Sequence, residues 1–256
     1  MWGPFGFTLA VARVIVALSL PYDISLPILA FSGLPLTITK PKNSGPVTRP
    51  KRSDDDQSKG LLYVCNHRTL LDPLYLCFAL KVNLTALTYS LSRMSEILAP
   101  IRTVRLTRNR DKDSIKMEKL LNQGDLVVCP EGTTCREPYL LRFSPLFSEI
   151  ADEVVPVAVE THVSMFHGTT AGGLKCLDPL FFLMNPSPIY TVQMLDKLSC
   201  LSTCRDASES RFHVANQVQG ELGKALGYEC TKLTRRDKYL ILAGNEGMVT
   251  ASTKSD

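Results

Sequence analysis

Between Leu61 and Val159 the chain alternates short apolar runs with segments in which apolar residues recur at helical spacing. The apolar runs are typical of buried strands, and the segments between them are typical of amphipathic helices. We expect strands at 61–65, 85–89, 103–106, 126–129 and 154–159, and helices at 73–81, 92–98, 114–122 and 145–151. This alternation predicts an α/β fold with a mixed sheet flanked by helices.

Changes in composition divide the 256 residues into four parts. Residues 1–39 are strongly apolar, 40–60 read as a polar linker, 61–245 carry the α/β pattern, and 246–256 form a polar tail. A chain of this length can bury the core of one domain of moderate size. We therefore expect a single folded domain at 61–245.

The first forty residues give a membrane signal with three interpretations. Residues 5–20 carry only Arg13 as a charge, and residues 24–38 carry none. The first stretch is shorter than the ~20 residues that cross a bilayer, and Pro27 and Pro35 interrupt the second. A spanning helix and a re-entrant or interfacial hairpin are both compatible with this pattern. A signal peptide is disfavoured because residues 1–4 contain no basic group.

Charge and cysteine content exclude some classes of protein. The net charge of +4 is too small to indicate a nucleic-acid partner. The eight cysteines show no paired metal-ligand spacing, so we expect no metal site. A reduced, cytosol-facing compartment fits unpaired cysteines best.

His67 and Asp72 lie five positions apart, where a predicted strand gives way to a predicted helix. A carboxylate that holds one ring nitrogen of a histidine fixes its tautomer, and the other nitrogen can then take a proton from an alcohol. Asp72 before Pro73 is a good N-cap, which would leave His67 in the preceding loop within reach of the carboxylate. The alternative is purely structural: a histidine in a turn beside a helix cap.

A cationic segment and a glycine-containing acidic loop follow. Residues 102–119 contain seven basic and three acidic side chains, which suggests an anion site. The alternative is a solvated surface, on which Arg105, Arg108 and Arg110 would share one face of an extended strand. Because ligands bind at the ends of strands in α/β sheets, we expect this segment and the Glu131 loop to lie near His67.

Three blocks in this order resemble the phospholipid and glycerol acyltransferases: the His67-x4-Asp72 run, residues 130–133 and residues 154–157. Residues 128–144 and 235–244 further resemble the land-plant membrane-bound glycerol-3-phosphate acyltransferases. The resemblance implies that residues 61–245 are the acyltransferase domain. We expect the chain to correspond to the acyltransferase half of such proteins, without the phosphatase-like domain that usually precedes the membrane segment.

The resemblance also implies roles for individual residues. His67 would be the general base and Asp72 its orienting carboxylate. The residues implied in binding substrate are Arg105, Arg108, Glu131, Gly132, Thr133 and Arg136. Val155 and Pro156 would lie on the acyl-donor side or serve in packing. The wider superfamily often has an arginine where this chain has Thr134, so the arginine that holds phosphate stays open, and Glu131 has an alternative role as an anchor for backbone amides.

The activity that the resemblance implies is acyl transfer from acyl-CoA to sn-glycerol 3-phosphate, favouring the sn-2 hydroxyl, to give lysophosphatidate. Acyl-CoA would be a co-substrate, and no cofactor is implied. The setting would be cutin, suberin, pollen-wall or membrane lipid synthesis, at the endoplasmic reticulum with a cytosolic active site, or at the mitochondrion. The alternatives are a lysophospholipid acyltransferase, an acyl ester or thioester hydrolase, and a non-catalytic remnant.

Overall fold

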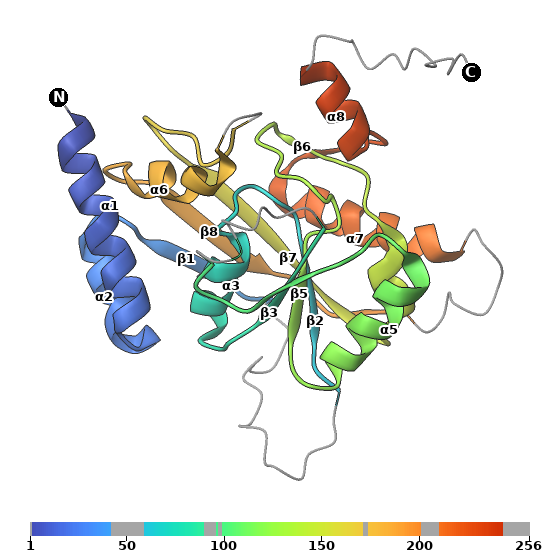
Figure 1. Ribbon diagram of the computed structural model, residues 1–256. Coiled ribbons are helices and arrows are strands. Elements are labelled where there is room, and N and C mark those ends of the chain that lie inside the picture. Colours follow the sequence, from blue (N-terminus) through green and yellow to red (C-terminus); the bar gives the residue numbers. More distant parts are fainter. Residues whose placement is uncertain are drawn as a thin grey trace, which may run out of the picture.

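The computed structural model of the chain describes residues 2–41, 59–89, 96, 99–170, 174–200 and 210–242 (Figure 1). The strands are β1 Leu36–Thr39, β2 Leu62–Cys65, β3 Thr85–Thr88, β4 Thr103–Arg105, β5 Leu126–Val128, β6 Tyr139–Leu140, β7 Glu153–His162, β8 Ile189–Met194, β9 Leu198–Ser199 and β10 Glu229–Cys230. The α-helices are α1 Trp2–Ser19, α2 Tyr22–Phe31, α3 Asp72–Leu80, α5 Arg110–Leu121, α6 Asp178–Leu183, α7 Ser210–Leu226 and α8 Arg235–Leu242. Two 3₁₀ helices are η1 Pro145–Glu149 and η2 Lys175–Leu177.

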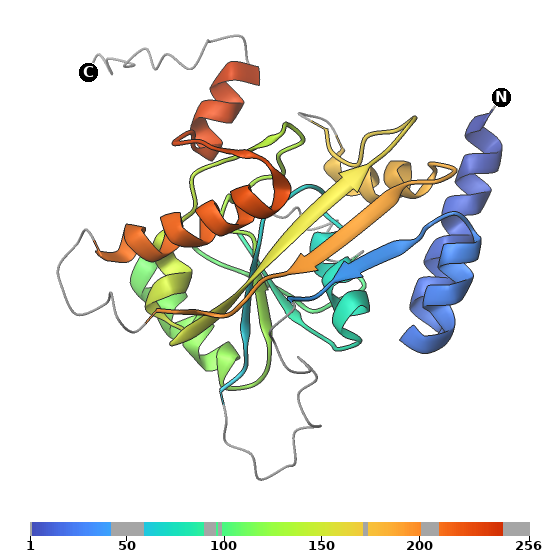
Figure 2. The same ribbon diagram turned by 180° about the vertical axis from the view of Figure 1, so that it is seen from behind.

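One mixed sheet organises the fold, with strand order β1-β8-β7-β2-β5-β3-β4. Strands β7, β2, β5, β3 and β4 run parallel to one another, and β8 runs antiparallel to β7. Strand β1 lies parallel to β8 at the sheet edge, and Figure 2 shows β7, β8 and β1 side by side. The predicted fold, a mixed α/β sheet flanked by helices, is confirmed.

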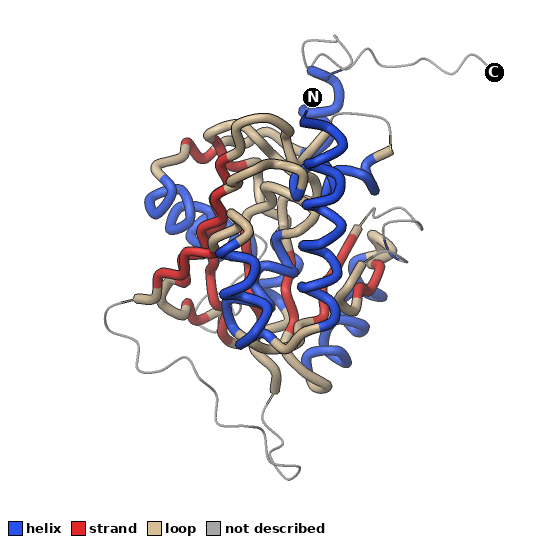
Figure 3. The backbone as a smooth tube through the Cα atoms, turned by 90° about the vertical axis from the view of Figure 1, so that its left-hand side faces the viewer, coloured by secondary structure: helices blue, strands red, loops and turns tan. Residues whose placement is uncertain are grey.

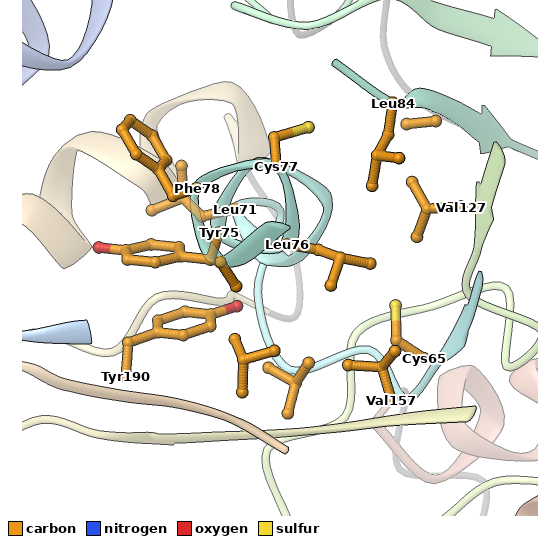
Figure 4. Close-up of a cluster of buried hydrophobic side chains, with 14 of the residues drawn as sticks. Cys65, Leu71, Tyr75, Leu76, Cys77, Phe78, Leu84, Val127, Val157 and Tyr190 are labelled. Carbon is orange, nitrogen blue, oxygen red and sulfur yellow. The ribbon is translucent and has the colours of Figure 1, made fainter. Parts of the chain in front are cut away.

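The side chains of alternate residues in the central strands point to opposite faces of the sheet, and both faces are buried. Leu62 and Val64 of β2 face a core built with α5, η1 and α7. Tyr63 and Cys65 face a second core built with α3, α6 and the N-terminal helices. Figure 4 shows this second core, where Leu76 of α3 lies above β2 and its neighbours. Burial of a leucine or phenylalanine side chain stabilises a fold by about 1.5–3 kcal/mol, so both layers hold the central strands in register.

The N-terminal helices α1 and α2 form a hairpin that packs against the edge of the domain beside α6 (Figure 3). Much of the hairpin's apolar surface is uncovered: Phe31 is 96 % exposed and Phe5 is 72 % exposed. Arg13 of α1 is buried and donates to the backbone oxygens of Leu183 and Asn185 at 2.7 and 2.6 Å. Among the described residues, α1 is the one helix long and apolar enough to cross a membrane.

Several predicted elements differ from those observed. Residues 36–39, placed by composition in the membrane-associated segment, form β1 and pair with β8. The helix predicted at 145–151 is the 3₁₀ helix η1. The helix predicted at 92–98, most of the linker and the tail at 246–256 lie outside the described residues. The sequence therefore located the central strands well, whereas short apolar segments were harder to assign.

Candidate active site

The site begins where the parallel strands end. Strand β2 leads into His67, β5 leads into Glu131, and β4 leads into Arg108. Because β2, β5, β3 and β4 run in one direction, their carboxyl ends meet at one edge of the sheet. Ligands bind at this edge in open α/β sheets.

Asn66 turns the chain away from the sheet just before His67. Its fully buried side-chain amide accepts from the backbone nitrogen of Val159 and donates to the carbonyl of the same residue, at 2.7 and 2.8 Å. The side chain therefore pairs with β7 as a backbone peptide would, one residue beyond the end of β2. The backbone is then free to leave the ladder and present His67.

His67 and Asp72 are in direct contact. Nδ1 of His67 lies 2.9 Å from Oδ2 of Asp72, and the Asp72 side chain is fully buried, whereas 16 % of the His67 side chain is exposed. Nε2 of His67 has no hydrogen-bond partner among the described residues. A histidine held in this way presents Nε2 as a proton acceptor.

The prediction that Asp72 is an N-cap is wrong. Asp72 is the first residue of α3, and its carboxylate makes no capping bond to that helix. It accepts instead from the backbone nitrogens of Arg68 and Thr69, at 2.6 and 3.0 Å, and from the Thr69 hydroxyl at 2.9 Å. The carboxylate points back into the turn that carries His67, which fixes the geometry of the pair.

Tyr190 of β8 is a further donor to Asp72 that the sequence did not reveal. Its buried hydroxyl donates to Oδ1 of Asp72. The Tyr190 ring stacks on Tyr75 of α3 (Figure 4), and the ring centroids are 3.6 Å apart. The Tyr75 hydroxyl is also buried but has no hydrogen-bond partner in the described part of the chain. Of these two adjacent tyrosines, Tyr190 donates a hydrogen bond to the Asp72 carboxylate and Tyr75 does not.

Glu131 joins the His67 loop to the loop that follows β5. Its carboxylate accepts from the backbone nitrogens of His67 and Leu141, at 2.8 and 3.1 Å. The carbonyl of His67 in turn accepts from the backbone nitrogen of Cys135 at 2.6 Å. Burial raises the pKa of Glu131 to about 7, although the two backbone bonds oppose this shift. The anchoring role left open by the sequence is thus present in the structure.

Arg108 stands in a strained turn between β4 and α5. Its φ of +67° lies in the left-handed region, which costs a non-glycine residue about 1–2 kcal/mol. Asp113 fixes this turn by accepting from the backbone nitrogens of Thr107 and Arg108, each at 2.7 Å. Since β4 ends at Arg105 and α5 begins at Arg110, the expectation that three arginines share one strand face is wrong. Strain of this kind is commonly kept at functional sites.

A cavity of about 800 Å³ opens beside Arg108 and the Glu131 loop. Its wall includes five arginines: Arg108, Arg110, Arg142, Arg235 and Arg236. The acidic residues in the wall are Asp113, Glu131 and Glu149. Arg110 pairs with Glu149 through two hydrogen bonds of 2.5 and 3.0 Å. Arginine guanidinium groups are suited to phosphate, so the cavity is equipped to bind a phosphorylated ligand.

The remaining residues implied by the resemblance lie outside this cavity. Nε of Arg105 forms an ion pair with Oε1 of Glu96 at 2.9 Å. Nη2 of the exposed Arg136 lies 3.7 Å from Oε1 of Glu137. Thr133 is buried, 3.5 Å from the hydroxyl of Tyr239. His67 does not line the cavity either, but its backbone is bonded to Glu131, which does.

Val155 and Pro156 are buried in β7 beside β2. Val155 belongs to the core that also contains Tyr63 and Tyr190. The resemblance implied either a place on the acyl-donor side or a role in packing, and this buried position fits packing.

Comparisons with known proteins show that the chain is similar to acyltransferases. A family model described as Acyltransferase matches residues 42–163. Probable glycerol-3-phosphate acyltransferase 2 of Arabidopsis thaliana is 62 % identical over 97 % of this chain, and glycerol-3-phosphate acyltransferase 1 of the same plant is 58 % identical over 97 %. Residues 42–163 therefore match this acyltransferase family, and nearly the whole chain is similar to the plant proteins. It covers 47 % and 41 % of these two relatives, so it spans about half the length of the curated relatives it matches.

Among solved structures, the crystal structure of the 1-acyl-sn-glycerophosphate acyltransferase PlsC from Thermotoga maritima aligns with 90 % of this chain and 90 % of its own. The TM-score is 0.49 and the sequence identity is 15 %.

The residues that the family resemblance implied make up only part of the candidate site. Asn66, Tyr190, Arg142, Arg235 and Arg236 contribute to it but were not among the predicted site residues. The Arg235-Arg236 pair stands in a segment that resembles the plant family, which was the available signal. Tyr190 gave none, because its partner Asp72 is 118 positions away in the sequence.

Proposed function

We propose that this chain transfers a fatty acyl group from acyl-CoA to a hydroxyl of sn-glycerol 3-phosphate, forming lysophosphatidate and releasing CoA. The observation that carries the proposal is the contact between His67 Nδ1 and Asp72 Oδ2 at 2.9 Å, which leaves Nε2 available on a loop whose backbone is hydrogen-bonded to Glu131 in the wall of an arginine-lined cavity. The match to the acyltransferase family and the names of the plant relatives support the choice of substrates.

In the proposed reaction, Nε2 of His67 accepts the proton of the acceptor hydroxyl while its oxygen attacks the thioester carbonyl. A carbon–oxygen bond forms, the carbon–sulfur bond breaks, and the CoA thiolate takes the proton from the imidazolium. The Asp72 carboxylate stabilises the imidazolium while it exists. Thiolate is a good leaving group, so the reaction needs no covalent enzyme intermediate.

Arg108 is our choice for the acceptor phosphate. It lines the cavity together with Glu131 and Gly132, and Glu131 is bonded to the backbone of His67. A guanidinium that holds phosphate through two parallel hydrogen bonds would orient the acceptor and present its hydroxyl to the base. Arg105 and Arg136 are weaker choices because each has a carboxylate within ion-pair distance and neither lines the cavity.

The acceptor position, the pathway and the location complete the proposal. The family resemblance favours the sn-2 hydroxyl and a role in cutin, suberin, pollen-wall or membrane lipid synthesis. The exposed apolar side chains of α1 and α2 support attachment of the hairpin to a membrane. We place the protein at the endoplasmic reticulum with its active site in the cytosol, in agreement with its free cysteines among the described residues.

The decisive experiment incubates the detergent-purified chain with acyl-CoA and labelled glycerol 3-phosphate, and identifies the regiochemistry of the product. We expect lysophosphatidate acylated at sn-2. Acylation only of a lysophospholipid acceptor would contradict the choice of glycerol 3-phosphate. Release of CoA without any acceptor would instead indicate a hydrolase.

A further inference from the structure

Three arginines from the C-terminal part of the domain form one group in the cavity wall. This C-terminal arginine cluster consists of Arg142, Arg235 and Arg236. The backbone nitrogen of Arg142 donates to the carbonyl of Leu233 at 2.8 Å, which brings the two segments together. The Arg142 guanidinium lies over Phe212 at 5.9 Å and that of Arg235 lies over Tyr239 at 5.4 Å. Aromatic faces therefore support two of the three guanidinium groups.

The cluster has no ion-pair partner among the described residues, although Asp237 of α8 interacts electrostatically with Arg236. Among the described residues, no carboxylate lies within 4 Å of a guanidinium nitrogen of Arg142, Arg235 or Arg236. The acidic groups of the cavity are already engaged. Glu149 pairs with Arg110, and the Asp113 carboxylate accepts from the turn at Thr107 and Arg108. Unpaired guanidinium groups in a concave site are typical of anion recognition.

Helix α8, which begins at Arg235, is held against the loop that carries Thr133. The Nζ of Lys175 donates to the Tyr239 hydroxyl at 2.7 Å, and this hydroxyl lies 3.5 Å from that of Thr133. Lys238 donates to the carbonyl of Thr134. Since the backbone nitrogen of Cys135 donates to the carbonyl of His67, the cluster is linked to the catalytic loop through a short chain of contacts.

One glycerol 3-phosphate does not account for this cavity. A volume of about 800 Å³ lies in the range of sites that hold ligands of drug size, and glycerol 3-phosphate is much smaller. A single phosphate group is satisfied by one or two arginines, and Arg108 already stands at the acceptor loop. CoA carries a diphosphate, a 3′-phosphate and an adenine ring. The ring of Phe212, 40 % exposed beside Arg142, is suited to stack on such a base.

We infer that the C-terminal arginine cluster is a second anion subsite, which binds the phosphates of the nucleotide part of CoA while Arg108 binds the acceptor. This inference rests on the proposed function, because it takes acyl-CoA as the donor. It assigns the two substrates to different arginines of one cavity.

Binding of the ligands can be measured without turnover. Titration calorimetry on the detergent-purified chain would use CoA, dephospho-CoA and glycerol 3-phosphate as separate probes. We expect Arg142→Gln and Arg236→Gln each to weaken CoA binding by about tenfold or more, since a hydrogen bond to a charged group is worth about 1.5–3 kcal/mol. Glycerol 3-phosphate affinity should change less than about twofold in both variants. A general effect on folding would instead lower the affinity for both ligands. The matched control is Lys224→Gln, an exposed cation of α7 paired with Glu221, which should alter neither affinity.

The ligand pair CoA and dephospho-CoA locates the 3′-phosphate. Wild-type protein should prefer CoA, and the variant that removes the arginine at the 3′-phosphate should bind both ligands equally. The inference would be overturned by unchanged CoA binding in both variants, by loss of glycerol 3-phosphate affinity alone, or by wild-type protein that binds no CoA. If a Gln variant loses affinity for both CoA and glycerol 3-phosphate, the test is repeated with Arg142→Lys and Arg236→Lys, which retain the positive charge. Wild-type protein that binds CoA through the cluster but acylates no acceptor would contradict the proposed function alone.

Discussion

A single loop, residues 67–72, supplies both members of the His67–Asp72 pair, whereas the arginines of the cavity come from three distant segments of the chain. Asp72 is buried and each of its carboxylate oxygens has donors, so the geometry of the pair is fixed by local contacts. The cavity is open, and its arginines are brought together by the packing of the strands and α8. The proposed proton transfer therefore depends on one tightly hydrogen-bonded turn, and the proposed ligand binding depends on tertiary structure. Variants can test each half separately.

The largest effect should come from the base itself. His67→Ala is expected to lower kcat by about a thousandfold, because general-base catalysis contributes roughly 10²–10⁴. The KM for glycerol 3-phosphate should stay within about threefold, since phosphate binding lies in the other half of the site. Steady-state kinetics of acyl transfer measure both constants. Unchanged kcat in a purified, folded variant would refute the role of His67.

Glu131, which joins the two halves, should make stability depend on pH. Its pKa is about 7 in the fold and 4.5 in its ordinary state, so the native protein binds more protons between these values. The contribution of Glu131 to the free energy of unfolding should therefore be greatest below about pH 4.5 and should fall by up to about 3 kcal/mol as the pH rises past 7. Urea unfolding of wild type and Glu131→Gln at pH 5 and pH 8 checks this. An equal pH dependence in both proteins would contradict the assignment.

Arg108 tests the binding half. Arg108→Gln should raise the KM for glycerol 3-phosphate by about 10- to 100-fold and leave kcat nearly unchanged. Arg105→Gln and Arg136→Gln should raise it less than about threefold, because these side chains lie outside the cavity. Acceptor titrations at saturating acyl-CoA give the comparison. A larger effect at Arg136 than at Arg108 would reverse our choice of arginine.

The smallest effect should separate two stacked tyrosines. Tyr190→Phe removes a donor to Asp72 and should lower kcat by about tenfold, with both KM values unchanged. Tyr75→Phe is the matched control, because it removes a buried hydroxyl that has no hydrogen-bond partner among the described residues and keeps the stacked rings. It should leave kcat unchanged and hold or raise the thermal midpoint of unfolding. Equal losses in the two variants would show that Tyr190 acts through packing alone.

The sequence predicted the central strands and the His67–Asp72 contact because both depend on residues close together in the chain. The strand at 154–159 was recognised from its apolar run, which is typical of a strand buried on both faces. The alternating pattern of β8 was also present, since Tyr190, Val192 and Met194 are buried while their neighbours are more exposed. It was not interpreted as a strand. Local periodicity therefore carried most of the fold.

The arginine cavity could not be predicted in the same way. Arg142 and Arg236 lie far apart in sequence, and they meet through a backbone hydrogen bond between Arg142 and Leu233. That contact does not follow from spacing or composition. The left-handed turn at Arg108 is set by Asp113, five residues later, and this local contact was not recognised in the sequence. Long-range packing decides which charges of a basic segment converge.

Arg13 fixes the orientation of the N-terminal hairpin on the domain and so bears on the proposed attachment to a membrane. Its guanidinium is hydrogen-bonded to Ser32 of the same hairpin and to backbone oxygens at the last residue of α6 and just after it. A hairpin on a flexible tether would lose rotational freedom when the domain settled on a bilayer. Here that freedom is already removed by folding, because α1, α2 and the domain are joined as one body. Adsorption through Phe5 and Phe31 would therefore fix the tilt of the whole molecule and the direction in which its cavity opens.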